Sequence, residues 1–116
     1  MSFNMRTVSI THENGNSISD VKVADTAPSR MRGLLGSKPL TIEQGLLITP
    51  CNSVHTFGMK YAIDVIFLNK KNYVIKIIKV MKPTRITGCF RASKVLEIAA
   101  GAADKNNIKK GDILSW

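Results

Sequence analysis

The chain has 116 residues, of which 44% are hydrophobic. This length suits one domain, and the composition allows an ordinary globular core. No apolar run approaches the roughly 20 residues that cross a bilayer. The first residues also lack the apolar block and the small-residue cleavage site of an export signal. We therefore expect a single domain over residues 1–116, located in the cytoplasm and without membrane association.

The chain is strongly basic, with 17 Lys and Arg residues against 8 acidic residues and a formal net charge of +9. Such an excess attracts nucleic acids, anionic lipids and acidic proteins. The basic residues are nevertheless scattered, and the longest runs are the pairs at 70–71 and 109–110. Aromatic residues make up only 6% of the chain, whereas proteins that bind single strands use aromatic side chains as stacking platforms. We expect no specific nucleic-acid partner.

The two cysteines are Cys51 and Cys89. A chain without an export signal meets a reducing compartment, in which disulfides are rare. We therefore predict that both residues are free thiols.

The first predicted elements are a β-hairpin and a short helix. Residues 5–10 and 17–24 mix β-branched with polar residues and flank the sequence ENGN, whose Asn-Gly pair is typical of a tight hairpin turn. Residues 25–36 predict a helix, with Asp25 or Thr26 as the N-cap and Pro28 in the first turn. Its apolar stripe is expected in the core, and its two basic residues in solvent. The stripe consists of Met31, Leu34 and Leu35, and the basic residues are Arg30 and Arg32.

The rest of the chain predicts further short strands. Residues 50–60 (PCNSVHTFGMK) have no clean period and contain Pro, Asn and Gly, which predicts a loop. Residues 101–108 offer a helical turn at most. The strand candidates are apolar or alternating runs at 45–49, 62–69, 73–80 and 94–100, with a closing strand in KKGDILSW.

These elements predict a mainly β (α+β) domain. We expect about six to eight short strands with one or two short helices, arranged as a small β-sandwich or a partly open barrel. Parallel βαβ units need more helices than this chain offers.

The segment GLLITPCNSVHTFGMKYAIDVIFLNKKNYVI resembles the core of the family called domain of unknown function 192, an uncharacterised ancient conserved region. RGLLG at 32–36, KPTRI at 82–86 and the tail from Ala92 to Asp112 match as well. The resemblance implies a compact, mainly β domain and supplies no established reaction. The positions that it carries over are Pro50, Cys51, Ser53, His55, Thr56, Phe57, Met59, Asp64, Arg85, Cys89 and Glu97.

Three side chains in segment 50–60 have chemistry of their own. Cys51 and His55 are residue types that form a nucleophile–base pair, and Asp64 or Glu97 would serve to orient the imidazole ring. Cys51, His55 and Met59 also form a soft ligand set. This set is suited to copper(I), or to zinc if the thioether of Met59 is left out. The alternative is that Cys51 and Met59 pack as small hydrophobes and that the histidine makes a structural hydrogen bond.

Asp64 is a single carboxylate within the apolar run AIDVIFL. A buried, unpaired carboxylate costs several kcal/mol, so this residue requires a partner. Arg85, Lys60 and His55 are candidates. In the alternative reading, Asp64 faces outward or anchors the loop through backbone N–H groups.

We therefore expect a domain that binds an unidentified small ligand or protein partner through the loop at 50–60. The alternatives are a Cys/His-dependent hydrolase or transferase and a soft-metal (copper or zinc) binding protein, so enzymatic activity stays open. No cofactor, metal ligand or catalytic residue is assigned, and a monomer or weak dimer is expected. The expected binding residues are Cys51, Asn52, Ser53, His55, Thr56, Met59, Asp64 and Arg85.

Overall fold

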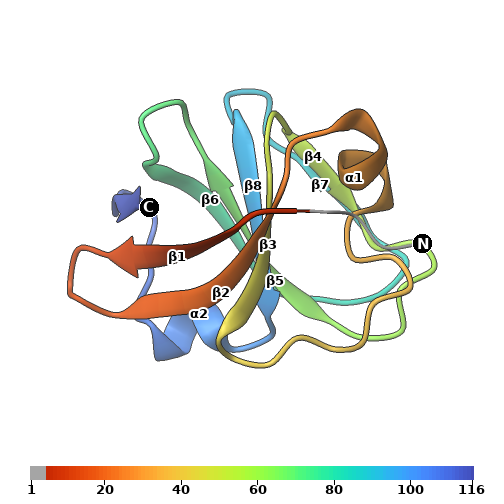
Figure 1. The fold of residues 1–116 in the computed structure, drawn as a ribbon, viewed down its shortest axis with the longest axis horizontal. Coiled ribbons are helices and arrows are strands. Elements are labelled where there is room, and N and C mark those ends of the chain that lie inside the picture. The colour runs from red at the N-terminus through yellow and green to blue at the C-terminus, as the bar shows by residue number, and fades with distance from the viewer. Residues whose placement is uncertain (1–4) are drawn as a thin grey trace.

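The computed structural model describes residues 5–116, which form nine strands and two helices (Figure 1). The strands are β1 (Thr7–His12), β2 (Ser17–Ala24), β3 (Gln44–Ile48), β4 (Ser53–His55), β5 (Ile63–Leu68), β6 (Val74–Met81), β7 (Ile86–Gly88), β8 (Lys94–Ala99) and β9 (Leu114–Ser115). The helices are α1 (Ala27–Arg32) and α2 (Ala102–Lys105).

Seven strands form one curled sheet in the order β6-β5-β8-β3-β2-β1-β9, and β4 pairs with β7 in a separate small sheet. This arrangement confirms the predicted mainly β fold with a partly open, barrel-like curvature. All neighbours in the large sheet are antiparallel except β2 and β3, which run parallel with α1 in the crossover between them. A parallel pair was not expected, because the chain has few helices, but one short helix is enough for one crossover.

The three central strands, β5, β8 and β3, are covered on both faces. All six residues of β5 are buried. Side chains alternate between the faces of a strand, so that Ile66 and Leu96 belong to one apolar cluster, shared with β1, β2 and α2. Val65 and Val95 belong to a second cluster, on the side that carries α1 and the small sheet. Figure 1 shows α2 on one side of these strands, and α1 with β4 and β7 on the other.

Helix α1 is shorter than predicted and differs from the prediction in the side chains that it buries. It begins at the N-cap Thr26, which forms a reciprocal capping box with Ser29, and it ends at Gly33, where φ is +54°. The positive φ turns the chain after six residues, so the i, i+3, i+4 spacing of the apolar stripe no longer describes one helix face. The prediction for the stripe is therefore wrong in two of its three positions: Leu34 is buried, but Met31 is 82% exposed and Leu35 is 45% exposed.

The predicted loop at 50–60 contains strand β4, which pairs with β7. Strands β4, β7 and β9 have only two or three residues each. A segment this short contains no measurable alternation of polar and apolar residues. This is why about six to eight strands were expected and nine are observed within residues 5–116.

Asp64 is the second residue of β5 and is 1% exposed. Its carboxylate accepts three backbone hydrogen bonds, from Val80 N at 2.8 Å, Gly101 N at 3.1 Å and Ala103 N at 3.0 Å. The side chain thereby ties β6 and the start of α2 to the central strand. The buried carboxylate therefore has the hydrogen-bond partners that burial requires. These partners are backbone N–H groups and not the side chains of Arg85, Lys60 or His55.

We expect Asp64→Asn to destabilise the fold by about 2–4 kcal/mol. The amide replaces one accepting oxygen by an N–H₂ group that faces a buried backbone donor, and the charge assistance is lost. Urea unfolding measures the free energy. Asp20→Asn, at a partly exposed carboxylate of β2 that contacts Lys22, is the control and should change stability by less than about 1 kcal/mol. Equal effects of the two variants would contradict the role given to Asp64.

Candidate functional site

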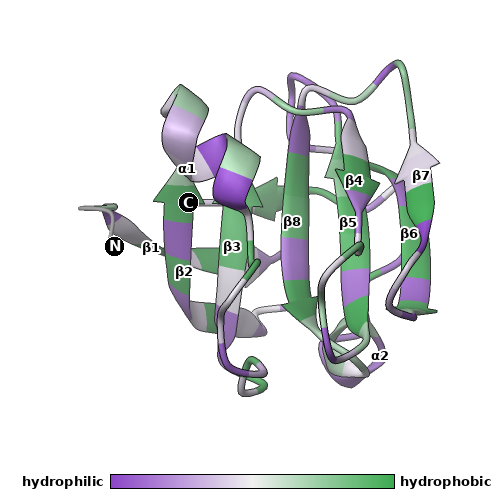
Figure 2. Ribbon diagram, turned by 90° about the vertical axis from the view of Figure 1, so that its right-hand side faces the viewer, coloured by the Kyte–Doolittle hydropathy of each residue, from purple (hydrophilic) through white to green (hydrophobic). Residues whose placement is uncertain are grey.

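A small cavity lies between helix α1, the segment 51–59 and strand β8. Its inner wall consists of buried side chains, among them Ile48, Val54 and Glu97. Exposed apolar side chains, including Met31 and Phe57, border its mouth. The volume open to the centres of water molecules is about 70 Å³, which is room for ordered water or for one small functional group. Figure 2 shows the side of the sheet on which α1 and the β4–β7 pair lie.

Strand register places Glu97 at the inner wall of this cavity. Glu97 lies in β8, between Leu46 of β3 and Val65 of β5. All three side chains are on the face of the sheet that carries α1. The carboxyl group is therefore flanked by two buried aliphatic side chains, and the residue is 4% exposed.

One oxygen of the Glu97 carboxyl group lacks a hydrogen-bond partner among residues 5–116. Its Oε1 atom is buried and makes no hydrogen bond. Gly33, where α1 ends, faces it closely, since a Cβ atom added there would lie 4.0 Å from Oε1. Burial disfavours the ionised form and raises the pKa of Glu97 to about 7. At neutral pH the carboxyl group is therefore protonated in a large fraction of the molecules, and in that form it both donates and accepts hydrogen bonds.

Two further buried polar atoms, in Arg30 and Tyr61, lack hydrogen-bond partners among the described residues. Arg30 lines the same cavity, and its Nε atom is buried without a hydrogen bond, while its Nη1 atom donates to Pro50 O at 3.3 Å. The Tyr61 hydroxyl group is likewise buried and unpartnered. Burial raises the pKa of Tyr61, and the charge of Glu97 raises it further. Arg30 is thus partly buried rather than solvated as expected.

The Cys51 thiol lines the cavity and is held by its own loop. Its Sγ atom donates to Ser53 O at 3.1 Å. Burial raises the pKa of Cys51, and the Glu97 charge acts in the same direction. A thiol with a raised pKa is mainly protonated at neutral pH, and the thiolate is the nucleophilic form. This environment therefore disfavours Cys51 as a nucleophile.

His55 also lines the cavity, but its ring is exposed and stacks on Phe57 at a centroid distance of 5.6 Å. Cys51, His55 and Glu97 do not bring their ligand atoms together. Among the residues that the structure describes, only His12, Glu13 and Asp112 form a group of three or more His, Cys, Asp or Glu side chains with all ligand atoms within 4.8 Å of one another. The cavity is thus not arranged as a His/Cys/carboxylate metal centre.

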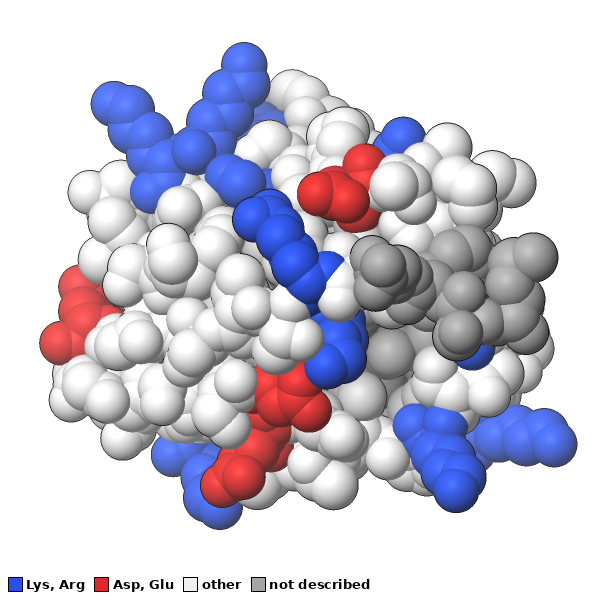
Figure 3. Space-filling model, viewed as in Figure 1, with Lys and Arg blue, Asp and Glu red and all other residues white. Residues whose placement is uncertain are grey.

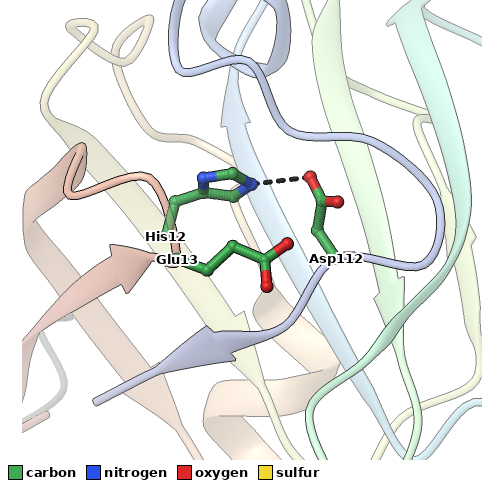
Figure 4. A group of neighbouring side chains, drawn as sticks. All are labelled: His12, Glu13 and Asp112. Carbon is green, nitrogen blue, oxygen red and sulfur yellow. Dashed lines mark hydrogen bonds and ion pairs between the residues drawn. The ribbon is translucent and has the colours of Figure 1, made fainter.

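The group around His12 is a structural clip between β1 and the C-terminal turn (Figure 4). His12 Nε2 lies 2.6 Å from Asp112 Oδ2, and His12 Nδ1 accepts a hydrogen bond from Asn14 N. Burial lowers the pKa of His12, but the hydrogen bonds of the ring and the charges of Asp112 and Glu13 together outweigh this effect, so the pKa lies above its ordinary value. Both ring nitrogens are already engaged, which leaves neither free for a metal ion.

Four of the eight expected binding residues line the cavity: Cys51, Ser53, His55 and Met59. The other four do not line it. The Thr56 hydroxyl group donates to Lys82 O and accepts from Arg85 N, which fastens the loop to the segment before β7. Asp64 faces the opposite side of the sheet because side chains alternate along β5. Asn52 and the Arg85 side chain are exposed, and the guanidinium donates to Pro83 O and Thr84 O.

The sequence contained a signal for Glu97, the buried carboxyl group of the cavity. Glu97 is a single carboxylate within the apolar run KVLEIAA, as Asp64 is within AIDVIFL. The reasoning about desolvation cost that singled out Asp64 applies equally to Glu97. Arg30 and Tyr61 had no comparable signal, because arginine is mostly exposed in proteins and tyrosine is intermediate in its burial.

Two of the basic residues, Arg30 and Arg32, line the cavity. On the face drawn in Figure 3, Lys and Arg side chains lie across the middle and at the edges, with acidic side chains beside some of them. None of the described helices has the length and apolar character needed to span a membrane.

The fold and the cavity define a small, mainly β domain with a partly enclosed polar pocket beside one short helix. A family model described as "Uncharacterized ACR" matches residues 8–116, so the chain belongs to the DUF192 family. The chain is 33% identical to a UPF0127 protein of Pyrococcus furiosus, over 84% of this chain and 86% of that protein.

Two solved structures have the same fold. A protein of unknown function from Novosphingobium aromaticivorans superimposes with a TM-score of 0.83 at 23% identity, over 97% of this chain and 85% of that one. A Sinorhizobium meliloti protein named a "putative transcription regulator" superimposes with a TM-score of 0.87 at 17% identity, over 99% and 97%. At these identities the likeness concerns the fold alone.

We expect Glu97→Gln to change how stability depends on pH. Because the pKa of Glu97 is raised in the folded state to about 7 from 4.5, the unfolded chain releases this proton first. Wild-type stability therefore falls as pH rises between these values and levels off above them. Relative to Glu97→Gln, the free energy of unfolding of the wild type should fall by about 3 kcal/mol between about pH 4 and about pH 8. Urea unfolding across this range is the measurement, with the exposed Glu43→Gln as control, and a constant difference would contradict the expectation.

We expect Cys51 to react slowly with alkylating reagents. In a Cys89→Ser background, iodoacetamide should modify the folded protein at least about tenfold more slowly than the urea-unfolded chain at neutral pH, because burial protects the thiol and keeps it protonated. Mass spectrometry follows the modification. Faster reaction in the folded state would show an activated thiolate and would favour the Cys/His enzyme hypothesis.

Proposed function

We propose that the domain binds a small ligand in the cavity between α1, the segment 51–59 and β8. The observation that carries this proposal is the unpartnered Glu97 Oε1 atom at the inner wall, together with Arg30 Nε. A buried polar atom without a partner costs about 1–3 kcal/mol. Native proteins keep few of these atoms, and a ligand that completes the missing hydrogen bonds recovers the cost on binding.

The surroundings of these two atoms also favour a ligand over a purely structural role. The cavity is lined by a few polar groups among apolar side chains, which is the composition of small-molecule sites, in which the polar groups orient a ligand. Met31 and Phe57 are large apolar side chains at the mouth that remain exposed. A ligand with an apolar part would cover them.

The alternative of a Cys51-dependent hydrolase or transferase has less support. The thiol donates its hydrogen bond to Ser53 O rather than to an imidazole, and its pKa is raised by burial. The soft-metal alternative lacks converging ligands, because the ring of His55 stacks on Phe57 at the surface.

We expect fragments of about ten heavy atoms or fewer to bind in the cavity. An NMR screen with equal shares of acids, amines and amides should shift the amide signals of residues 30–34 and 51–57. At a concentration about tenfold above Kd, a bound fragment should raise Tm by about 5 °C.

Two variants with phenylalanine at neighbouring positions provide a matched control. Ser53→Phe places a ring at the mouth, because Ser53 lines the cavity, and should abolish the shifts. Asn52→Phe adds the same ring at an exposed position outside the lining and should preserve them. The proposal fails if no fragment class perturbs the two segments, or if both variants behave alike.

A further inference from the structure

The two unpartnered atoms of the cavity determine which ligand chemistry they fit. Arg30 Nε carries an N–H group and is a donor only. Glu97 Oε1 belongs to a carboxyl group whose burial favours its protonated form, which also donates. A neutral carboxylic acid held in an apolar site is a strong donor to an anionic oxygen. The residues that carry these two donors line the same cavity, and together they call for a ligand group with two accepting oxygens.

The charges around the cavity favour an anion. Arg30 and Arg32 both line it, and Glu97 is the only carboxylate among the described lining residues. The remaining titratable groups near Glu97 are the Cys51 thiol, the His55 imidazole and the Tyr61 hydroxyl group, none of which is a permanent charge. The chain as a whole has a net charge of +9. A cationic ligand would approach against this field, whereas an anionic ligand is attracted.

The dimensions of the cavity limit the size of the charged group. About 70 Å³ is open to the centres of water molecules, which is room for one small charged group such as a carboxylate. The exposed apolar side chains of Met31, Leu35 and Phe57 border the opening of the cavity. A short hydrocarbon chain attached to the carboxylate would lie along these side chains.

We propose that the cavity binds a small monocarboxylic acid with a short apolar tail, whose carboxylate accepts hydrogen bonds from Arg30 Nε and from the protonated carboxyl group of Glu97. This inference rests on the proposed ligand-binding function and adds the class of ligand. The bound pair consists of one ligand carboxylate and one neutral carboxyl group, so that the site carries a single negative charge beside Arg30. Ionisation of Glu97 would place two carboxylates next to each other and expel the ligand.

Binding is therefore coupled to a proton at Glu97. The ligand is ionised throughout the neutral range, whereas the fraction of protonated Glu97 falls as pH rises above about 7. Since the apparent affinity follows the fraction of binding-competent protein, Kd should increase about tenfold from about pH 6 to about pH 8.

Isothermal titration calorimetry with butyrate, butyramide and butylamine tests this inference in a buffer without carboxylates. We expect butyrate to bind most tightly and to show the tenfold change with pH.

Glu97→Gln, which always presents an N–H donor, should bind butyrate with no pH dependence. Arg30→Gln should weaken binding at least about tenfold, and Arg30→Lys, which keeps the charge without Nε, should also weaken it. Arg91→Gln, at an exposed position outside the cavity, should leave Kd unchanged.

The outcomes separate the ligand class from the ligand-binding function. If butyramide or butylamine binds more tightly than butyrate and shifts the amide signals of residues 51–57, the cavity binds ligands and the monocarboxylate inference is wrong. If butyrate binds with the same Kd at both pH values, or if Arg91→Gln weakens binding as much as Arg30→Gln, the inference is also wrong. If no compound, in this series or in the fragment screen, perturbs the cavity, both proposals fail.

Discussion

The burial of β3, β5 and β8 on both faces is the constraint on which the rest of this structure depends. A sheet of mostly antiparallel strands commonly leaves one face to solvent. Here the curled sheet encloses one apolar cluster with α2, and α1 with the β4–β7 pair covers the other face. The carboxylates of Asp64 and Glu97 are consequently removed from water and must find their hydrogen bonds inside the protein, or on a ligand.

The two carboxylates of the central strands meet this constraint in opposite ways. Asp64 accepts three backbone hydrogen bonds and ties β6 and α2 to the sheet. Glu97, on the other face, has an oxygen without a partner among the described residues, and burial raises its pKa to about 7. The same residue chemistry thus produces a structural anchor on one face and a group available to a ligand on the other.

The cavity around Glu97 is assembled from segments that are far apart in the sequence. Gly33 ends α1 early and lets the chain approach the carboxyl group, while β4 presents Ser53 and His55 from the opposite side. The chain belongs to the DUF192 family, whose model spans residues 8–116, a range that includes all these segments. The fold likeness to solved structures of low identity extends over nearly the whole chain. A site of this kind depends on the complete fold rather than on a local motif.

Alternation, turn residues and capping residues act locally, and this is why the sequence by itself determined the strands at 17–24, 45–49, 62–69 and 94–100 and a helix start at Asp25 or Thr26. It also determined that a carboxylate inside AIDVIFL needs a partner. The tertiary structure alone decided the parallel pairing of β2 with β3, the choice of Thr26 as the N-cap, the exposure of Met31 and Leu35, and the three-residue strands β4 and β7, since these depend on contacts beyond the local sequence. It likewise decided which carboxylate is satisfied, because strand register and the neighbours on each face, not the apolar runs, give Asp64 its backbone donors and deny them to Glu97.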